Sequence, residues 1–205
     1  MHNHTWGGGR PSTRPPRCTS CLLRRDADLN SPTRTRSGIL DATGAAHLLG
    51  TADTPLADIG SRAPLLEDHQ PVLIGYDPTD PDSFKAGALA AHPALRHFDD
   101  ATVRANPIGT ARLAVTALTG PDAVVAIHFD VDAVDSHDLP LANFPHYGTG
   151  VSLAAAGQVL EELLASPGVQ AVVLTEVNPT HDPAGTALSR YVDTVTNAIA
   201  RVFHR

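Results

Sequence analysis

The sequence predicts an α/β protein of three α/β/α layers, in which helices cover both faces of a parallel sheet. Two observations carry this prediction. Short apolar runs alternate with segments of helical periodicity, which is the order that successive βα units produce. Two of these runs also end directly in acidic residues, at the position where parallel strands commonly build ligand sites. The chain has 205 residues, 42% of them hydrophobic, which is enough for one such domain.

The first 25 residues differ in composition from the rest of the chain. Residues 1–25 are rich in Gly, Pro and Arg and have no hydrophobic period, so we expect a disordered segment. Residues 26–205 are then expected to form the folded domain, and we expect it to be partial, with the first strands of its sheet missing. The cysteine pair Cys18 and Cys21 has no second pair, which makes it a weak zinc signal. We expect two free thiols in the disordered segment.

Each element between residues 26 and 118 follows from a local pattern. Residues 26–32 form a polar loop, and apolar residues at helical spacing, closed by Gly50, predict a helix over 39–49. The apolar run 71–76 predicts a buried strand. Asp80 or Asp82 then begins a helix that extends to about residue 91. A short strand at 95–98 and a helix at 110–118 complete this part.

The remaining elements follow the same alternation. The run 123–130 is a strand with both faces buried, and a loop rich in Pro and Gly follows at 136–150, a length that is usually functional. Ser152 begins a helix with one apolar side. Residues 169–177 form the last strand, and a final helix covers about 183–203. The domain therefore contains four expected strands.

Three carboxylates mark the carboxyl ends of two of these strands. Asp130 and Asp132 close the strand at 123–130, and side chains two apart on a strand share a face. Glu176 closes the strand at 169–177, and parallel strands end at the same edge of the sheet. Such an oxygen set suits a hard divalent cation such as Mn²⁺ or Mg²⁺. The alternative is that these residues cap turns and face water.

Composition and charge exclude several classes of protein. No apolar run reaches 18 residues, and no secretory signal is present, so we expect a cytoplasmic protein without a membrane span. Residues 1–36 hold seven Arg and two Asp, whereas residues 37–205 hold eight basic and twenty acidic residues. An acidic body argues against nucleic-acid binding and is compatible with a cationic partner, either a metal or a substrate.

Three motifs, in this order along the chain, resemble those of one family. Residues 128–135, H-F-D-V-D-A-V-D, resemble the S-F-D-V-D-x-x-D-P signature of the arginase–agmatinase, or ureohydrolase, family. Residues 149–152, T-G-V-S, resemble its G-G-L-[ST] segment, and residues 175–179, T-E-V-N-P, resemble its E-V-N-P segment. The resemblance covers roughly residues 26–203. The chain is therefore similar to the ureohydrolases, as an N-terminally truncated or divergent member.

The resemblance implies a fold, a reaction and a cofactor. Ureohydrolases have an α/β sheet with two Mn²⁺ ions at the carboxyl ends of its strands, and they hydrolyse a guanidino C–N bond with release of urea. Two metals supply hydroxide at neutral pH, which the weakly electrophilic guanidinium carbon requires. By this resemblance Asp130 and Asp132 would bind metal. Glu176 would hold the guanidinium group of the substrate.

The loop upstream of these motifs is similar to that of arginases in particular. Residues 28–38, D-L-N-S-P-T-R-T-R-S-G, match the pattern D-I-N-T-P-x-x-T-x-S-G without gaps. Asp28 would be a metal ligand. Three residues would bind the α-carboxylate of an arginine-like substrate: Asn30, Thr35 and Ser37. Asp80 would bind its α-amino group. Family members form trimers and hexamers, so a homo-oligomer is a further expectation.

The chain also departs from the family pattern near its first metal ligands. Where family members carry D-A-H-x-D, the aligned residues here are Arg24, Asp26 and Asp28. Arg24 places a cation where a bridging carboxylate belongs, and Asp26 could bind metal in place of the histidine. Asp41 stands where arginases have a proton-shuttling histidine, which makes it a candidate catalytic residue beside Glu176. Two functions follow: a manganese-dependent hydrolase of a small guanidino substrate, or an inactive member with at most partial metal binding.

Overall fold

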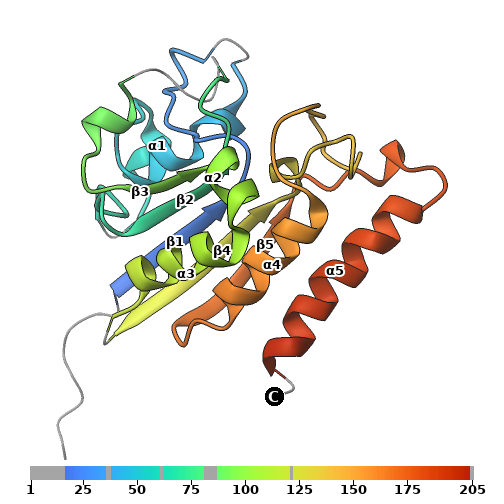
Figure 1. Ribbon diagram of the computed structural model, residues 1–205. Helices are drawn as coiled ribbons and strands as arrows, with labels where there is room; N and C mark the ends of the chain where they lie inside the picture. Colours follow the sequence, from blue (N-terminus) through green and yellow to red (C-terminus); the bar gives the residue numbers. More distant parts are fainter. Residues whose placement is uncertain (1–16, 36–37, 61, 81–86, 121, 204–205) are drawn as a thin grey trace, which may run out of the picture.

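A computed structural model describes residues 17–35, 38–60, 62–80, 87–120 and 122–203 of the protein, and these residues form a single parallel sheet flanked by helices (Figure 1). The sheet has five strands in the order β3-β2-β1-β4-β5. Their bounds are β1 Arg17–Leu23, β2 Pro71–Tyr76, β3 Arg96–Asp99, β4 Ala123–Asp130 and β5 Val169–Thr175. All four pairings are parallel, so the carboxyl ends of the strands meet at one edge.

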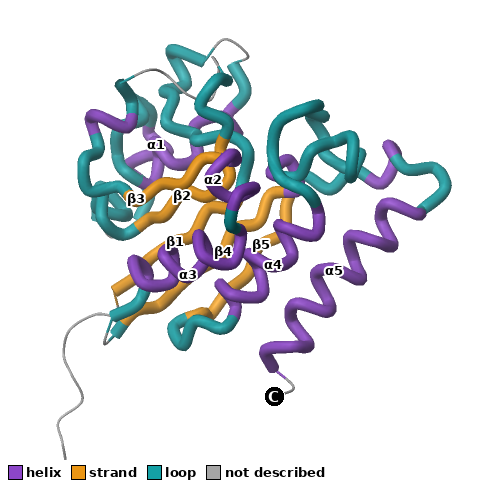
Figure 2. Tube along the Cα trace, in the orientation of Figure 1, coloured by secondary structure: helices purple, strands orange, loops and turns teal. Residues whose placement is uncertain are grey.

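Helices cover the two faces of the sheet unequally, as Figure 2 shows. The α-helices are α1 Gly44–Leu48, α2 Asp100–Ala105, α3 Pro107–Leu118, α4 Leu153–Leu164 and α5 Thr186–Phe203. The larger core lies between the sheet and α2 to α5 and includes Phe129, the largest of the fully buried side chains. A smaller core, which includes Leu22, Leu73 and Leu49, lies between β1, β2 and the segment of α1. The expected three-layer α/β/α architecture is confirmed.

The central strand β1 corrects the expectation that residues 1–25 are disordered, as far as residues 17–25 are concerned. Arg17–Leu23 pairs with β2 on one side and β4 on the other, and Cys21 and Leu23 are fully buried. Only three consecutive apolar residues occur in this strand, too few to show a period. The strand is instead stabilised in the interior because its two neighbouring strands satisfy its backbone hydrogen-bonding groups. Residues 1–16 lie outside the described part of the chain.

The expected free thiols lie in this strand. Cys18 is exposed and Cys21 is buried, and both are free. Residues three apart on a strand point to opposite faces, so these two thiols cannot jointly bind one zinc ion. Burial raises the pKa of the Cys21 thiol far above its ordinary value, which makes it an inert core residue.

Most of the other expected elements are present, with shifts at their ends. The strands at 71–76, 95–98 and 123–130 are confirmed as β2, β3 and β4, and the strand at 169–177 ends earlier, at Thr175. The helix at 39–49 begins as a 3₁₀ turn over Leu40–Thr43 and continues as α1. Of the helix expected to reach residue 91, residues 81–86 lie outside the described part, and Leu89–Ala91 is a 3₁₀ turn. The short helix α2 was not expected.

The strand β5 forms one edge of the sheet within the described residues. Its pattern of apolar residues predicts burial, yet Val173 is 49% exposed and Leu174 is 41% exposed. Val192 and Ile199 on the neighbouring helix α5 are also exposed. An edge strand with exposed apolar side chains favours self-association. No helix in the described part of the chain is long and apolar enough to span a membrane.

Candidate functional site

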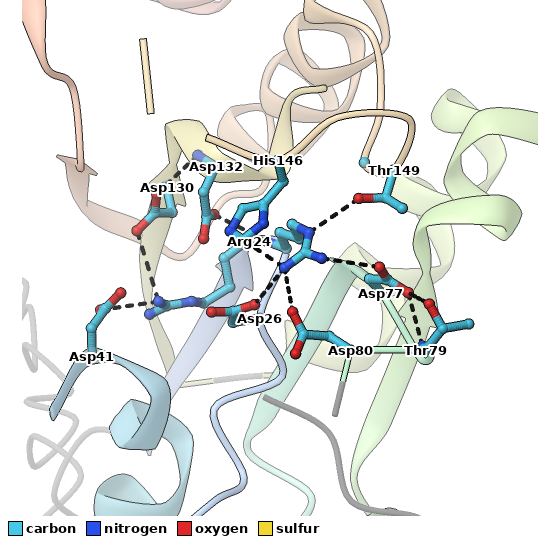
Figure 3. Close-up of polar contacts among 12 residues, drawn as sticks. Arg24, Asp26, Asp41, Asp77, Thr79, Asp80, Asp130, Asp132, His146 and Thr149 are labelled. Carbon is cyan, nitrogen blue, oxygen red and sulfur yellow. Dashed lines mark hydrogen bonds and ion pairs between the residues drawn. The ribbon is translucent and has the colours of Figure 1, made fainter. Parts of the chain in front are cut away.

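The carboxyl ends of β1, β4 and β5 bring charged side chains together at one edge of the sheet (Figure 3). Asp130 is the last residue of β4, and Glu176 follows directly after β5. Arg24 and Arg25 follow directly after β1. Because β1 lies between β2 and β4, its two arginines enter the middle of the acidic edge. The site is therefore built from two cations within a group of carboxylates.

The aspartate pair that closes β4 is buried and held by local hydrogen bonds. Asp130 begins a 3₁₀ turn, and its Oδ1 accepts a hydrogen bond from the backbone N–H of Asp132 at 3.0 Å. The Thr175 hydroxyl donates to the other oxygen of Asp130 at 2.9 Å. Asp132 Oδ1 accepts from the backbone N–H of Arg25 at 3.1 Å. These bonds fix both carboxylates toward the arginines, as Figure 3 shows for Arg24.

The guanidinium group of Arg24 lies among three carboxylates. Its Nη1 is 2.5 Å from Asp28 Oδ2, and its Nη2 is 3.0 Å from Asp41 Oδ1 and 3.8 Å from Asp130 Oδ2. Arg24 is 3% exposed, and Asp28 and Asp130 are fully buried. Asp41 comes from the 3₁₀ turn before α1 and is partly exposed. Arg24 thus joins segments that follow β1 and β4 to the segment of α1.

Burial and neighbouring charges together raise the pKa values of Asp28, Asp132 and Arg24 above their ordinary values. Burial raises the pKa of Asp28 well above its ordinary value, although the Arg24 guanidinium opposes that shift. The pKa of Asp132 is raised by burial and by the negative charge of Asp130. Burial acts to lower the pKa of Arg24, but the carboxylates around it, Asp28 foremost, raise the pKa above its usual value. Arg24 therefore stays a cation while excess negative charge remains around it.

The guanidinium group of Arg25 makes a second network beside the first. Its Nη2 donates to Asp77 Oδ2 at 3.2 Å, and its Nη1 donates to Asp80 Oδ2 at 2.5 Å and to Asp26 Oδ1 at 3.2 Å. Its Nε donates to the Thr149 hydroxyl at 3.1 Å, which reaches the loop between β4 and α4. Arg25 is buried, and its hydrogen bonds connect the ends of β1 and β2 to that loop.

An acidic cavity of about 190 Å³ opens beside these two networks. It is lined by Asp26, Ile39, Asp41, Ala42, Asp80, Asp132, Phe144, His146 and Glu176. The atom Oε2 of Glu176 is buried and has no hydrogen-bond partner among the described residues. The backbone of Glu176 has a φ of 62°, an unfavourable value for a residue with a side chain. Burial and the charge of Asp130 raise the pKa of Glu176, although a hydrogen bond with the Asn143 side chain acts to lower it.

Most of the predicted site residues lie at the carboxyl edge of the sheet, and the others lie elsewhere or outside the described residues. Asp26, Asp28, Asp41, Asp80, Asp130, Asp132 and Glu176 lie in the two arginine networks or line the cavity. Asn30 is buried but lines a different cavity, of about 500 Å³, together with Thr33 and Arg34. The Thr35 hydroxyl accepts a hydrogen bond from the backbone N–H of Gly38, and Thr35 lines neither cavity. Ser37 lies outside the described residues.

Three residues of the site carried no signal that singled them out in the sequence: Arg25, Asp77 and His146. His146 belongs to the loop at 136–150, whose length alone marked it as functional. Thr149 opens the T-G-V-S motif, but no contact with Arg25 was expected for it. Burial and the charge of Arg25 lower the pKa of His146, which favours its neutral form at neutral pH. Arg25 adjoins Arg24 in a segment whose composition indicated disorder. Its contacts with the carboxylates of the site were therefore not predicted.

The fold and the site together define an α/β protein with a group of acidic residues at the carboxyl edge of a parallel sheet. The model of the arginase family matches residues 21–200, so the chain belongs to the arginase family. The match begins five residues before the segment expected from the motifs, within β1. No match to this chain is found among the curated proteins.

Solved structures with this fold include arginases and a related enzyme. An arginase from Bacillus caldovelox superposes with a TM-score of 0.77 at 21% identity, over 89% of this chain and 60% of that chain. The arginase of Entamoeba histolytica, in complex with L-ornithine, gives 0.73 at 18% identity, over 95% and 62%. Formimidoylglutamase from Bacillus subtilis gives 0.61 at 15% identity, over 89% and 53%. This chain thus spans about three fifths of the length of these arginases.

The arginase family is generally metal-dependent, and the residues here do not fit a metal centre. A divalent ion needs carboxylate oxygens at about 2.0–2.6 Å on several sides. The oxygens of Asp28, Asp41 and Asp130 that face one another surround the guanidinium of Arg24 instead. Among the described residues, no group of three or more His, Cys, Asp or Glu is placed to hold a metal ion. The expected metal ligands Asp28 and Asp130 therefore lie close together, but around the guanidinium group of Arg24.

Proposed function

We propose that this chain binds a small organic cation with a guanidinium group in the acidic cavity. We further propose that it is an inactive member of its family, which does not hydrolyse the bound compound. The single observation that carries the proposal is Glu176. Its Oε2 atom is buried beside the cavity and has no hydrogen-bond partner among the described residues, although the Glu176 side chain also interacts with Asn143 through a hydrogen bond that lowers its pKa. A buried acceptor without a partner costs about 1–3 kcal/mol, more when it is charged, and a bound donor removes that cost.

The charge of the cavity supports a cationic ligand. Five of its nine lining residues are carboxylates, and the only basic side chain among the nine is His146, whose lowered pKa favours the neutral form. Arg24 and Arg25 neutralise part of this charge from outside the lining. A planar guanidinium can donate two parallel hydrogen bonds to one carboxylate, which matches Glu176 better than an ammonium group does.

The arrangement supports recognition of the guanidinium end of the ligand more than of an amino-acid end. Asn30 and Thr35, expected to bind an α-carboxylate, do not line this cavity. Asp80, expected to bind the α-amino group, does line it, but one of its oxygens already accepts a hydrogen bond from Arg25. We therefore infer that a guanidino compound without a carboxylate, such as agmatine, binds at least as well as arginine.

The manganese-dependent hydrolase expected from the resemblance needs divalent ions among the carboxylates, where Arg24 lies. The direct test is incubation of the purified protein with Mn²⁺ and arginine or agmatine, followed by assay for urea. We expect no urea above the level of a protein-free control. Urea release that Asp130→Asn abolishes would favour the hydrolase instead. A cytoplasmic location and a trimeric or hexameric assembly stay predictions.

Binding is tested by isothermal titration calorimetry with guanidinium chloride, agmatine and arginine, in metal-free buffer. Guanidinium chloride is kept at millimolar levels, below those that denature proteins. We expect saturable binding, which Glu176→Gln weakens by about tenfold or more because one charge-assisted hydrogen bond is lost. Glu162→Gln is the matched control, since Glu162 pairs with Arg112 on the surface, away from the cavity. Equal affinities for the wild type and Glu176→Gln would refute the proposal.

A further inference from the structure

We propose that the Arg24 side chain is the permanent cation of this site: it takes the place of a divalent ion among Asp28, Asp41 and Asp130, and its removal opens a metal site that the wild-type protein does not offer. This inference concerns the arginine network alone. It does not depend on which ligand the neighbouring cavity binds, and it holds or fails independently of that binding.

The first argument is position. One guanidinium group reaches three carboxylates that arrive from different segments: Asp28 after β1, Asp41 before α1, and Asp130 at the end of β4. The separations from Arg24 nitrogens are 2.5, 3.0 and 3.8 Å. Figure 3 shows Arg24 extended between Asp41 and Asp130. A cation bound by these oxygens would have to lie within contact distance of the guanidinium nitrogens, and like charges at that range repel.

The second argument is the incomplete satisfaction of Asp28. This residue is fully buried, and its Oδ1 has no hydrogen-bond partner among the described residues. Its Oδ2 contacts Arg24 as an ion pair, without the geometry of a hydrogen bond. The Nε of Arg24 is likewise buried without a hydrogen-bond partner. A cation with fewer directional demands than a guanidinium would satisfy the buried oxygens of Asp28 more completely.

The third argument is that Arg24 cannot leave or lose its charge. A guanidinium group is not deprotonated in proteins, so changes of pH do not free the position for a metal ion. Arg24 is 3% exposed and covalently attached, so it occupies this position without diffusing in from solution. Part of the surrounding negative charge is thus compensated when the protein folds, without any ion from solution.

The consequence is a latent metal site. Shortening Arg24 to serine leaves Asp28, Asp41 and Asp130 facing the vacated space. Three carboxylates form the hard oxygen set that Mn²⁺ and Mg²⁺ prefer. Two of them are fully buried, so each is strongly destabilised unless a cation arrives. The partly exposed Asp41, on a short 3₁₀ turn, is the ligand that can move inward around a smaller ion.

The experiment measures Mn²⁺ binding by calorimetry and thermal melting by circular dichroism, in EDTA and in Mn²⁺. For the wild type we expect no stoichiometric Mn²⁺ binding and the same melting temperature in both buffers. For Arg24→Ser we expect a lower melting temperature in EDTA, a saturable rise with Mn²⁺, and one bound ion per chain. Arg24→Lys keeps a cation in place, so its melting temperature should respond to Mn²⁺ far less.

Two further variants make the test specific. Arg104→Ser removes an arginine that pairs with a single buried carboxylate, Asp100, at 2.5 Å, so Mn²⁺ should not restore its stability. Asp130→Asn added to Arg24→Ser should abolish the response to Mn²⁺. Stoichiometric Mn²⁺ binding by the wild type overturns the proposal, and so does a folded Arg24→Ser protein that gains none. If Arg24→Ser does not fold in EDTA, refolding in Mn²⁺ supports the proposal, and failure to refold there overturns it.

Discussion

Replacing Arg25 by methionine is expected to lower the free energy of unfolding by about 3–5 kcal/mol, because it removes one partner from a buried ion pair. Asp77 loses the guanidinium nitrogen at 3.2 Å and keeps, among the described residues, the two hydrogen bonds that Thr79 donates to its other oxygen. Asp80 loses a contact at 2.5 Å, and the Thr149 hydroxyl loses a donor. Against a typical total of about 5–15 kcal/mol, this is a large fraction of the stability of the domain.

The assay is urea unfolding at neutral pH, followed by far-ultraviolet circular dichroism. Adding Asp77→Asn to Arg25→Met should recover part of the loss, since no unpaired charge then remains at Asp77. Arg112→Met is the matched control, because Arg112 pairs with Glu162 on the surface and should contribute little. If Arg25→Met costs no more than Arg112→Met, the reasoning about burial is wrong.

Three other substitutions test separate parts of the fold. Phe129→Ala should destabilise the protein by about 3–5 kcal/mol in the same assay, because Phe129 is fully buried and its ring centroid lies 6.0 Å from that of Tyr191. Asp138→Asn should cost no more than about 1 kcal/mol at neutral pH, since Asp138 accepts a hydrogen bond from the partly exposed Arg190 at 2.6 Å. That bond lowers the pKa of Asp138, so its contribution is present above the ordinary value of 3.8 and is lost as the pH falls through the lower folded-state pKa. The stability difference between wild type and Asp138→Asn should therefore shrink in acid, and a difference that grows there would contradict this assignment. Val173→Lys should raise the concentration at which the protein stays monodisperse in size-exclusion chromatography, because it places a charge on the exposed edge strand; unchanged self-association would show that β5 is not the surface involved.

The sequence predicts the strands whose apolar runs are long enough to stand out. β2 and β4 have six and eight residues, nearly all apolar, and turn residues follow them. β1 escapes prediction because arginine, threonine and serine interrupt it, and its place in the sheet depends on pairing with strands that lie about 50 and 100 residues further on. Such pairing between distant segments outweighs the local composition of the strand. It cannot be recognised from a short stretch of sequence. The six residues of α2 are too few to show a helical period.

The candidate site is predictable where it depends on strand ends and less so where it depends on side-chain partners. Asp130 and Glu176 could be placed at one edge because parallel strands share their direction. The resemblance also indicated a cation at Arg24 in the place of a metal ligand. Which carboxylates this arginine contacts could not be predicted, because Asp28 reaches it through a backbone with a φ of 53°. The network of Arg25 depends on β1 and β2 being neighbours, which required β1 to be known.

The two arginines after β1 explain why the acidic cavity keeps its negative charge. A divalent ion brings two positive charges to a set of carboxylates, whereas a guanidinium brings one. Arg24 and Arg25 together face Asp26, Asp28, Asp41, Asp77, Asp80 and Asp130. Negative charge therefore remains, and part of it acts on Glu176, whose pKa is raised by burial and by Asp130 and Asp41. A cation bound beside Glu176 lowers this repulsion. Under the proposed function, Arg24 in the place of a metal ion would remove the means of activating water, while the remaining negative charge would favour binding of an organic cation.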